Sequence, residues 1–277
     1  MKPRVLCVGL ATLDAIHVVA DVPARDGRVV ASRFAQAGGG PAATAAVALA
    51  ALGVDVAFAG AVGDDETGAR IVRDLASAGV DVSRLDVQPE AASPHSAILA
   101  AADGSWRSIV HHPGTADLPA VDATGFDWVH VDHAGYGRVR LGDARLSIDG
   151  GNPIPNLDLT DVALYAPTET ELANAFGGPA GALAAGAETV VVTRGAGGSR
   201  AWTADGDEID APGVAVDAVS TLGAGDVFHG ALLAFVAREA PLSDALRAAN
   251  AAAALSCRAL DGRSAIPTLD ELERTLA

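Results

Sequence analysis

The sequence is nearly devoid of lysine: of its 19 basic residues only Lys2 is a lysine, and the others are arginines. This absence excludes the nucleotide sites that are built on lysine. A Walker A loop needs Gly-Lys followed by Ser or Thr, and a protein-kinase site needs a buried lysine. If this chain transfers phosphate, backbone amides, a metal ion and arginine must stabilise the phosphoryl charge.

Cysteine is scarce as well, and no apolar run is long. Cys7 and Cys257 lie in apolar surroundings without metal-ligand spacing, which predicts buried free thiols in a reducing compartment. The longest apolar stretches, such as residues 45–54, are too short for a membrane span, and we find no signal-peptide pattern. We therefore expect a cytoplasmic protein.

Positive charge is in deficit, because 35 acidic residues oppose 19 basic ones and give a net charge of −16. Nucleic acid and anionic membranes are poor partners for such a chain. The 277 residues fit one large α/β domain or two smaller ones. The expected partners are small molecules.

The most informative stretch is Ser220-Thr-Leu-Gly-Ala-Gly-Asp-Val-Phe-His-Gly-Ala231, which predicts a loop that runs into a helix. Its Gly-Ala-Gly lets an anion approach the backbone, and the N-terminus of the helix adds unpaired N–H groups. Asp226 then lies where a carboxylate can take a proton from an attacking hydroxyl. The alternative is that Asp226 only caps the helix.

A second glycine-rich stretch, residues 38–53, opens on three glycines and continues as an alanine-rich helix. Pro41 suits its first turn and Gly53 its C-terminal stop. From the residues alone this is a tightly packed helix after a flexible loop.

Both stretches resemble the two signatures of the ribokinase-like (PfkB) carbohydrate kinases. The resemblance implies that Gly223, Ala224 and Gly225 form an anion hole and that Asp226 is the catalytic base. Residues implied to contact the sugar are Asp14, Gly39, Gly40 and Thr44, and Thr44 stands where the family usually has Asn. It also implies a single α/β domain over residues 1–277, a three-layer sandwich with a mostly parallel central sheet and a small β lid.

ATP and Mg²⁺ are the cofactors that the resemblance implies. The nucleotide-side residues are Thr193, Arg194, Gly195, Gly197 and Asn250. Glu171 is expected to act on Mg²⁺ through a water molecule, in an element where Thr168 replaces the family's Asn; first-turn helix-dipole complementarity explains Glu171 equally well. Because Ser220 stands where the family often has an Asp linked to a monovalent cation, dependence on potassium is doubtful.

The lid is expected from strands within about residues 14–36 and 95–113. Short strands at 16–19 and 28–31 flank a turn, and a hairpin spans 96–112 with an Asp-Gly turn. We expect His111 on that hairpin to face the sugar. Relatives often pair lid edges across a two-fold axis, so a homodimer through the lid is possible.

The acceptor implied by the resemblance is a sugar hydroxymethyl group. The residues around Arg28 and the glycine-rich loop look most like the sulfofructose kinases, where a basic lid residue binds the sulfonate. The substrate is therefore expected to be a ketohexose or 6-deoxy-6-sulfofructose, with a sugar acid left open. Two alternatives are a non-catalytic sugar- or nucleotide-binding protein and a metal hydrolase built on His130, Asp132 and His133.

Overall fold

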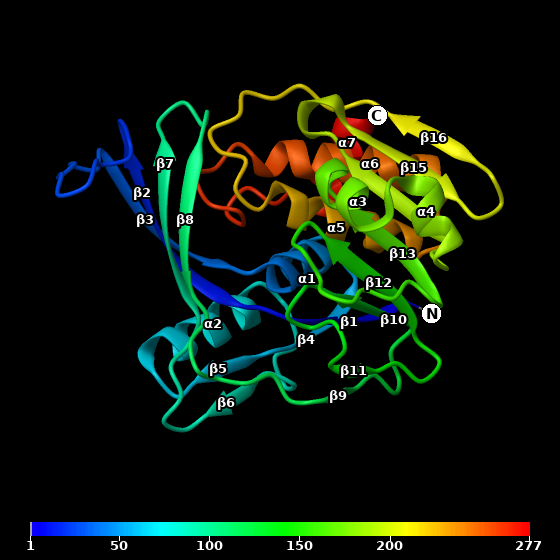
Figure 1. Ribbon diagram of the computed structural model, residues 1–277, viewed down its shortest axis with the longest axis horizontal. Coiled ribbons are helices and arrows are strands. Elements are labelled where there is room, and N and C mark those ends of the chain that lie inside the picture. The colour runs from blue at the N-terminus through cyan, green and yellow to red at the C-terminus, as the bar shows by residue number, and fades with distance from the viewer. Residues whose placement is uncertain (1) are drawn as a thin grey trace.

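An eight-stranded sheet forms the middle of the molecule in the computed structural model, which describes residues 2–277 (Figure 1). Its spatial order is β16-β15-β14-β13-β12-β10-β1-β4. The strands are β1 (Arg4–Val8), β4 (Asp55–Ala59), β10 (Trp128–Val131), β12 (Arg145–Gly150), β13 (Val162–Pro167), β14 (Thr189–Thr193), β15 (Ser199–Thr203) and β16 (Glu208–Ala211). The six strands from β14 to β4 are parallel, whereas β15 and β16 add an antiparallel edge.

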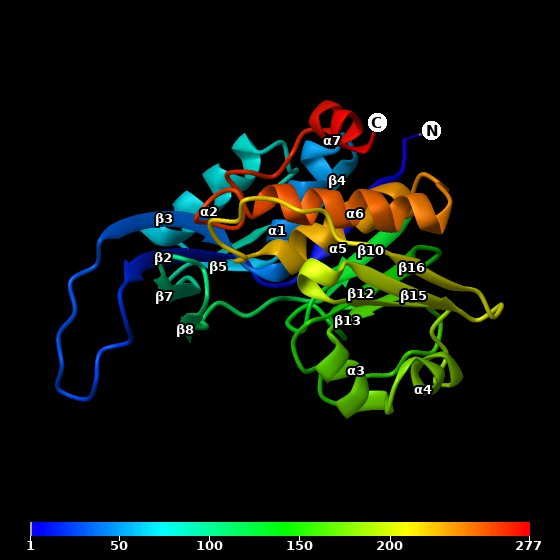
Figure 2. The same cartoon turned by 90° about the horizontal axis from the view of Figure 1, so that it is seen from above.

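Helices cover both faces of this sheet (Figure 2). One face carries α1 (Pro41–Ala51), α5 (Ala224–Val236), α6 (Leu242–Ser256) and α7 (Leu269–Leu276), and the other carries α3 (Glu169–Phe176) and α4 (Pro179–Ala184). Strands covered on both faces are predominantly apolar, as in β10 and β13, whose residues are all buried. The expected three-layer α/β sandwich is confirmed.

Alanine and glycine bring α1 and α5 very close together. A Cβ added to Gly230 of α5 would lie 2.5 Å from the Ala45 carbonyl oxygen and 2.9 Å from the Ala48 Cβ on α1. This contact holds the two helices that begin in the two glycine-rich stretches against each other.

The face that carries α3 and α4 is thinner than its opposite. The link from β10 to β12 contains only the short strand β11 (Val139–Arg140), which pairs with β9 (Val121–Asp122). Residues 151–161, between β12 and β13, also lack a helix. No crossover helix therefore connects β10 to β12.

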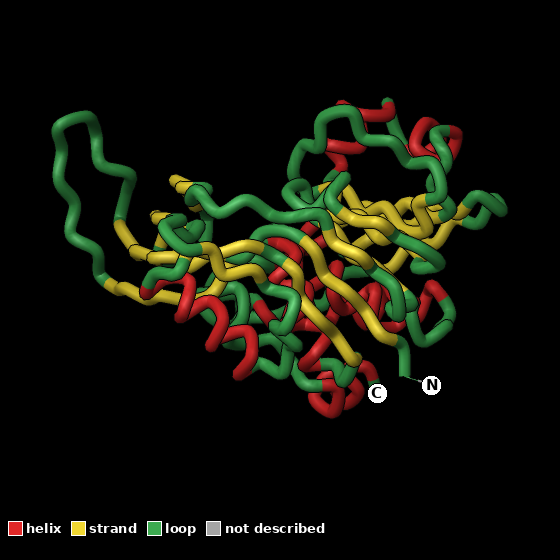
Figure 3. Tube along the Cα trace, turned by 90° about the horizontal axis from the view of Figure 1, so that it is seen from below, coloured by secondary structure: helices red, strands yellow, loops and turns green. Residues whose placement is uncertain are grey.

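A separate four-stranded sheet, which we call the lid, projects from one side of the molecule (Figures 1 and 3). Its order is β3-β2-β7-β8, with β2 (Thr12–Val19), β3 (Arg33–Gly39), β7 (His95–Ala101) and β8 (Arg107–His112). The elements α2 (Glu66–Ser77), β5 (Ala61–Gly63) and β6 (Asp86–Gln88) lie beside it.

The hairpin expected over residues 96–112 is confirmed as β7 and β8, but the strand expected at 28–31 is wrong. Residues 20–32 form a projecting loop, because β2 ends at Val19 and the pairing of β3 with β2 starts only at Arg33. No strand therefore lies opposite residues 28–31.

Cys7 and Cys257 are both buried and unpaired, as expected. No helix within residues 2–277 is long and apolar enough to cross a membrane. Phe34, Ile109 and Val110 are exposed apolar side chains on the lid strands β3 and β8. The homodimer through this sheet stays a prediction.

Candidate active site

A cavity of about 430 Å³, the sugar-side cavity, opens between the lid and the carboxyl ends of the parallel strands. It brings together Asp14, Gly39, Gly40, Thr44 and His111 with Gly223, Gly225 and Asp226. These residues come from both glycine-rich stretches and from the lid. The structure therefore unites most of the residues expected to contact the sugar with the expected catalytic base.

Asp14 lies at the floor of this cavity and is only 8% exposed. Its Oδ1 accepts a hydrogen bond from Thr12 Oγ1 at 2.8 Å. A Cβ at Gly39 would collide with the Asp14 carboxylate, so this position requires glycine. The second carboxylate oxygen is thus held beside the glycine backbone.

Arg263 is a site residue that the sequence did not reveal. Its Nε donates to Thr44 Oγ1 at 3.1 Å and its Nη2 donates to the Gly39 carbonyl oxygen at 2.6 Å. The guanidinium also occupies the space that a side chain at Gly38 would fill. Thr44 and Arg263 together therefore hold the glycine-rich loop from behind.

A second cavity of about 550 Å³, the nucleotide-side cavity, lies across α5 from the first. Small apolar residues and glycines form most of its wall, among them Gly195, Gly198, Val214, Ala224 and Ala253. Thr193, Thr221 and Gly225 line both cavities. Two ligands bound on the two sides would therefore meet at the N-terminus of α5.

The N-terminus of α5 forms the shared wall. Gly223 caps the helix in the left-handed conformation, with φ of 72°, and a Cβ there would lie 2.8 Å from the Gly262 Cα. The Ala224 N–H donates a long hydrogen bond to the Thr221 carbonyl oxygen at 3.3 Å. The helix supplies no acceptor for the N–H groups of Gly225 and Asp226, which suits an anion.

Asp226 lies in the first turn of α5 and faces the sugar-side cavity. Burial and the nearby Asp149 carboxylate raise the pKa of Asp226 to about 7, against the opposing effect of His229. A carboxylate with a pKa near neutral is a better general base than an exposed aspartate.

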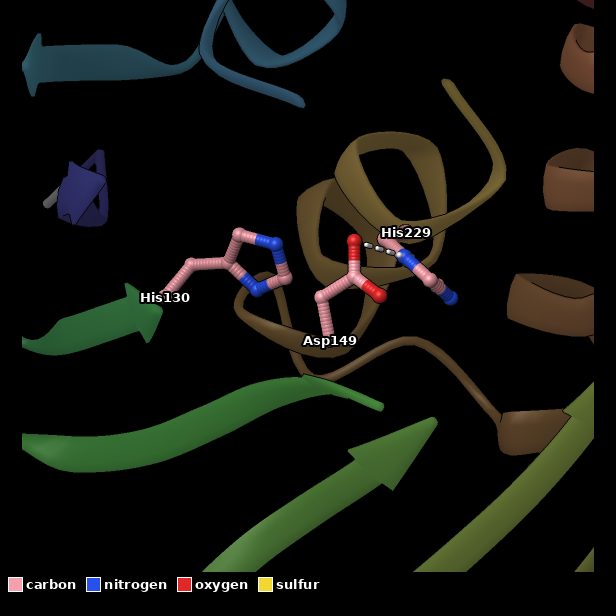
Figure 4. Close-up of side chains that lie close together, drawn as sticks. All are labelled: His130, Asp149 and His229. Atoms are coloured by element: carbon pink, nitrogen blue, oxygen red, sulfur yellow. Dashed lines mark ion pairs between the residues drawn. The ribbon is translucent and has the colours of Figure 1, made fainter. Parts of the chain in front are cut away.

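Asp149, at the end of β12, pairs with His229 of α5, whose Nδ1 lies 3.0 Å from Asp149 Oδ2 (Figure 4). Burial disfavours the charged form of each group, but the attraction between the two opposite charges is stronger. The pKa of Asp149 therefore falls to about 2 and the pKa of His229 rises. His130 of β10 faces the same pair, and burial lowers its pKa to about 4. His229 is therefore charged and His130 neutral.

The suggested metal set of His130, Asp132 and His133 is wrong. Asp132 instead accepts four backbone hydrogen bonds, at Oδ2 from Leu10 and Ala42 and at Oδ1 from Ala134 and Gly135, at 2.8 to 3.1 Å. His133 lines the sugar-side cavity, whereas His130 faces Asp149. These three side chains therefore point to different partners.

Several expected ligand contacts are not found. Arg28 is exposed in the projecting loop and lines neither cavity. Arg194 turns away to pair with Asp210 at 2.6 Å, and Gly197 lies outside the nucleotide-side wall, to which Gly195 and Gly198 contribute. Arg194 points away from the cavity because the antiparallel strands β15 and β16 place the carboxylate of Asp210 within its reach.

Two more expected residues make hydrogen bonds within the protein. Asn250 lines the nucleotide-side cavity, but its Nδ2 donates to the carbonyl oxygens of Ala211 and Pro212. Glu171 lies in the first turn of α3, where its N–H donates to Thr168 Oγ1, and only Thr168 lines the sugar-side cavity. The role of Glu171 toward Mg²⁺ stays a prediction.

Comparison with known proteins agrees with this geometry. The family model described as pfkB family carbohydrate kinase matches residues 2–132 and 157–269. An ATP-dependent ribose-1-phosphate kinase of Halopiger xanaduensis is 30% identical over 99% of this chain and 98% of its own length. The ribokinase of Bacillus subtilis is 29% identical over 99% of this chain and all of its own length.

Among solved structures, Arabidopsis thaliana ribokinase complexed with ribose and ATP is 23% identical and shares the fold, with a TM-score of 0.84 over 99% of this chain and 98% of its own. Fold, cavities and relatives together define a phosphotransferase that uses an alcohol group as acceptor. The chain belongs to the pfkB family of carbohydrate kinases.

Replacing Asp226 with Asn should lower kcat by about 10²–10⁴-fold, because the hydroxyl loses its general base. Nucleotide binding and the melting temperature should change little. Steady-state kinetics, calorimetric titration with ATP and thermal melting check this. Near-normal turnover in the variant would refute the base role.

The activity should also depend on pH. Since the base must be ionised and the pKa of Asp226 is raised to about 7, kcat/KM should rise about tenfold per pH unit below neutrality and level off above it. A pH profile of kcat/KM measures this. The expectation is contradicted if kcat/KM instead falls only near the ordinary pKa of aspartate, or if kcat/KM does not change with pH.

Two glycines of one motif should respond differently to alanine. Gly223→Ala places a side chain at positive φ, at a cost of about 1–2 kcal/mol before its contact with Gly262 is counted. Gly225→Ala meets no atom within 4 Å, so the fold should keep its stability, while the methyl group enters the space where both ligands meet. Thermal melting and KM for ATP separate the two effects; equal destabilisation would contradict this reading.

Proposed function

We propose that this kinase transfers the γ-phosphoryl group of ATP to the hydroxymethyl group of a ribofuranose that carries a phosphate, with ribose 1-phosphate as the leading candidate. The observation that carries the proposal is the position of Asp226, which faces the sugar-side cavity beside the wall shared with the nucleotide-side cavity. A hydroxyl held between Asp14 and Asp226 is thereby placed next to the transferred group.

The residues of the chain act in three ways. Asp14 and Gly39 orient the sugar, and Asp226 takes the proton of the hydroxymethyl group as its oxygen attacks phosphorus. The N–H groups at the start of α5 hold the negative charge of the phosphoryl group in transit. The alternative of a non-catalytic binding protein does not account for a half-buried aspartate at this junction or for the kinase relatives.

ATP fits the nucleotide-side cavity. Apolar residues such as Val214 and Ala253 suit an adenine ring, and Gly195, Gly198 and Gly225 allow close approach of phosphates to the backbone. When bound, Mg²⁺ neutralises charge on the phosphates, and Thr168 and Asn152 are oxygen donors on the wall of the sugar-side cavity. Glu171 stands behind Thr168 and would act through water.

Arg107, which lines the sugar-side cavity, supports an anionic sugar, whereas burial lowers the pKa of His111 and leaves that imidazole neutral at pH 7. Arg107, His111 and His133 line this cavity, and Arg107 Nη1 donates to Thr221 Oγ1 at 3.0 Å, which brings the lid against the shared wall. The ribose-1-phosphate kinase from Halopiger xanaduensis is a relative over nearly the full chain. A ketohexose or 6-deoxy-6-sulfofructose is less well supported, because Arg28 lies outside the cavity.

Arginine variants test the substrate. Arg107→Gln should lower kcat/KM for ribose 1-phosphate by about tenfold or more, because a charged hydrogen bond to the phosphate is lost. Phosphorylation of ribose itself, which lacks that phosphate, should change much less. A coupled assay for ADP with both sugars, fructose and 6-deoxy-6-sulfofructose measures the specificity.

Arg28→Gln is the matched control, since it removes the same charge from the same lid without touching the cavity. Its kinetics should equal those of the unaltered chain. Preference for the sulfonated sugar, with a loss of activity confined to Arg28→Gln, would overturn the assignment in favour of a sulfosugar kinase.

A further inference from the structure

Three buried side chains from distant parts of the sequence converge beneath the sugar-side cavity. The proposed phosphoryl transfer does not require any of them to bind a ligand. They are His130 at the end of β10, Asp149 at the end of β12 and His229 in α5, which are 1%, 3% and 6% exposed. One nitrogen or oxygen atom from each lies within 4.8 Å of the others. Figure 4 shows the three side chains pointing toward one another.

His130 lies outside the ion pair between Asp149 and His229, and that pair does not explain why this third side chain is buried beside it. Its Nδ1 lies 3.0 Å from Ser147 Oγ, whereas its buried Nε2 has no hydrogen-bond partner within residues 2–277. Buried polar atoms without a partner are rare and indicate a missing water or ion. A proton on Nδ1 that faces Ser147 leaves the Nε2 lone pair directed into the cluster, which is how metal-bound histidines are oriented by a second residue.

We propose that His130, Asp149 and His229 bind a divalent first-row transition-metal ion, such as Mn²⁺ or Zn²⁺. Two imidazoles and one carboxylate suit such ions, whereas Mg²⁺ prefers oxygen ligands alone. The site is therefore distinct from any Mg²⁺ that accompanies ATP.

The spacing of the ligand atoms supports this assignment. His229 Nδ1 and Asp149 Oδ2 are 3.0 Å apart, and two neighbouring ligands with bonds of about 2.1 Å are separated by about 3.0 Å around an octahedral ion and about 3.4 Å around a tetrahedral one. The His130 ring nitrogen lies within 4.8 Å of the other two ligand atoms, so binding of the ion draws the three side chains closer together. Asp149 and His229 also line the sugar-side cavity, so a further coordination position faces the bound sugar or water.

Metal binding can be tested without ATP or sugar, so the result does not depend on the proposed substrate. The full chain, prepared without a histidine tag and stripped with a chelator, is titrated calorimetrically with Mn²⁺, Zn²⁺ and Mg²⁺. We expect one Mn²⁺ or Zn²⁺ per chain, a raised melting temperature, and release of a proton as His229 becomes a ligand. Mg²⁺ should give none of these three responses.

Variants locate the ion. His130→Gln should weaken binding by more than about tenfold, and Ser147→Ala by about tenfold through loss of ring orientation. His112→Gln, which removes an exposed lid histidine outside the cluster, should bind as the unaltered chain does. Circular dichroism confirms that each variant is folded.

Should His130→Gln fail to fold, the visible absorption of Co²⁺ added to the unaltered chain reports nitrogen ligation directly, and displacement of Co²⁺ by Zn²⁺ shows a shared site. Two results overturn the proposal. One is the absence of binding by both Mn²⁺ and Zn²⁺, which leaves water as the partner of His130. The other is equal affinity in His130→Gln and the unaltered chain, which places the ion elsewhere.

Discussion

One buried carboxylate, that of Asp132, fixes the relative positions of the segments that form the sugar side. Its two oxygens accept four N–H groups, which belong to the end of β1, the first turn of α1 and the loop after β10. A buried carboxylate with this many donors is satisfied by the backbone alone and holds all three segments in place. Asp14 and Gly39 take their positions from these anchored segments.

Charge around the reaction centre is balanced within the protein. Asp14, Asp149 and Asp226 crowd one region, and the cations His229 and Arg263 offset them. These cations do not fully compensate the negative charge at Asp226, since burial and Asp149 raise the pKa of this residue to about 7. A lysine-poor chain thus reaches a proton-accepting carboxylate through burial and like-charge proximity, and a helix N-terminus replaces the missing ammonium group.

The sequence was sufficient for the parts of the site that depend on backbone constraints. Gly39 and Gly223 mark places where no side chain fits, so the glycine motifs predicted both loops and the helices after them. Long-range side-chain pairs could not be predicted: Arg263 meets Thr44 across 219 residues, and Arg194 binds Asp210 only because β15 and β16 fold back. The three-residue spacing of Asp226 and His229 was a usable signal, since it places both on one helix face.

The wall shared by the two cavities has a pharmacological consequence. Thr193, Thr221 and Gly225 contact the spaces on both sides, so the protein between the two binding regions is only one residue thick at that point. A conjugate that joins adenosine to a sugar through a short phosphate bridge would engage both regions at once, and its second half would bind at a high effective concentration. Bisubstrate compounds should therefore inhibit this enzyme more strongly than either half alone.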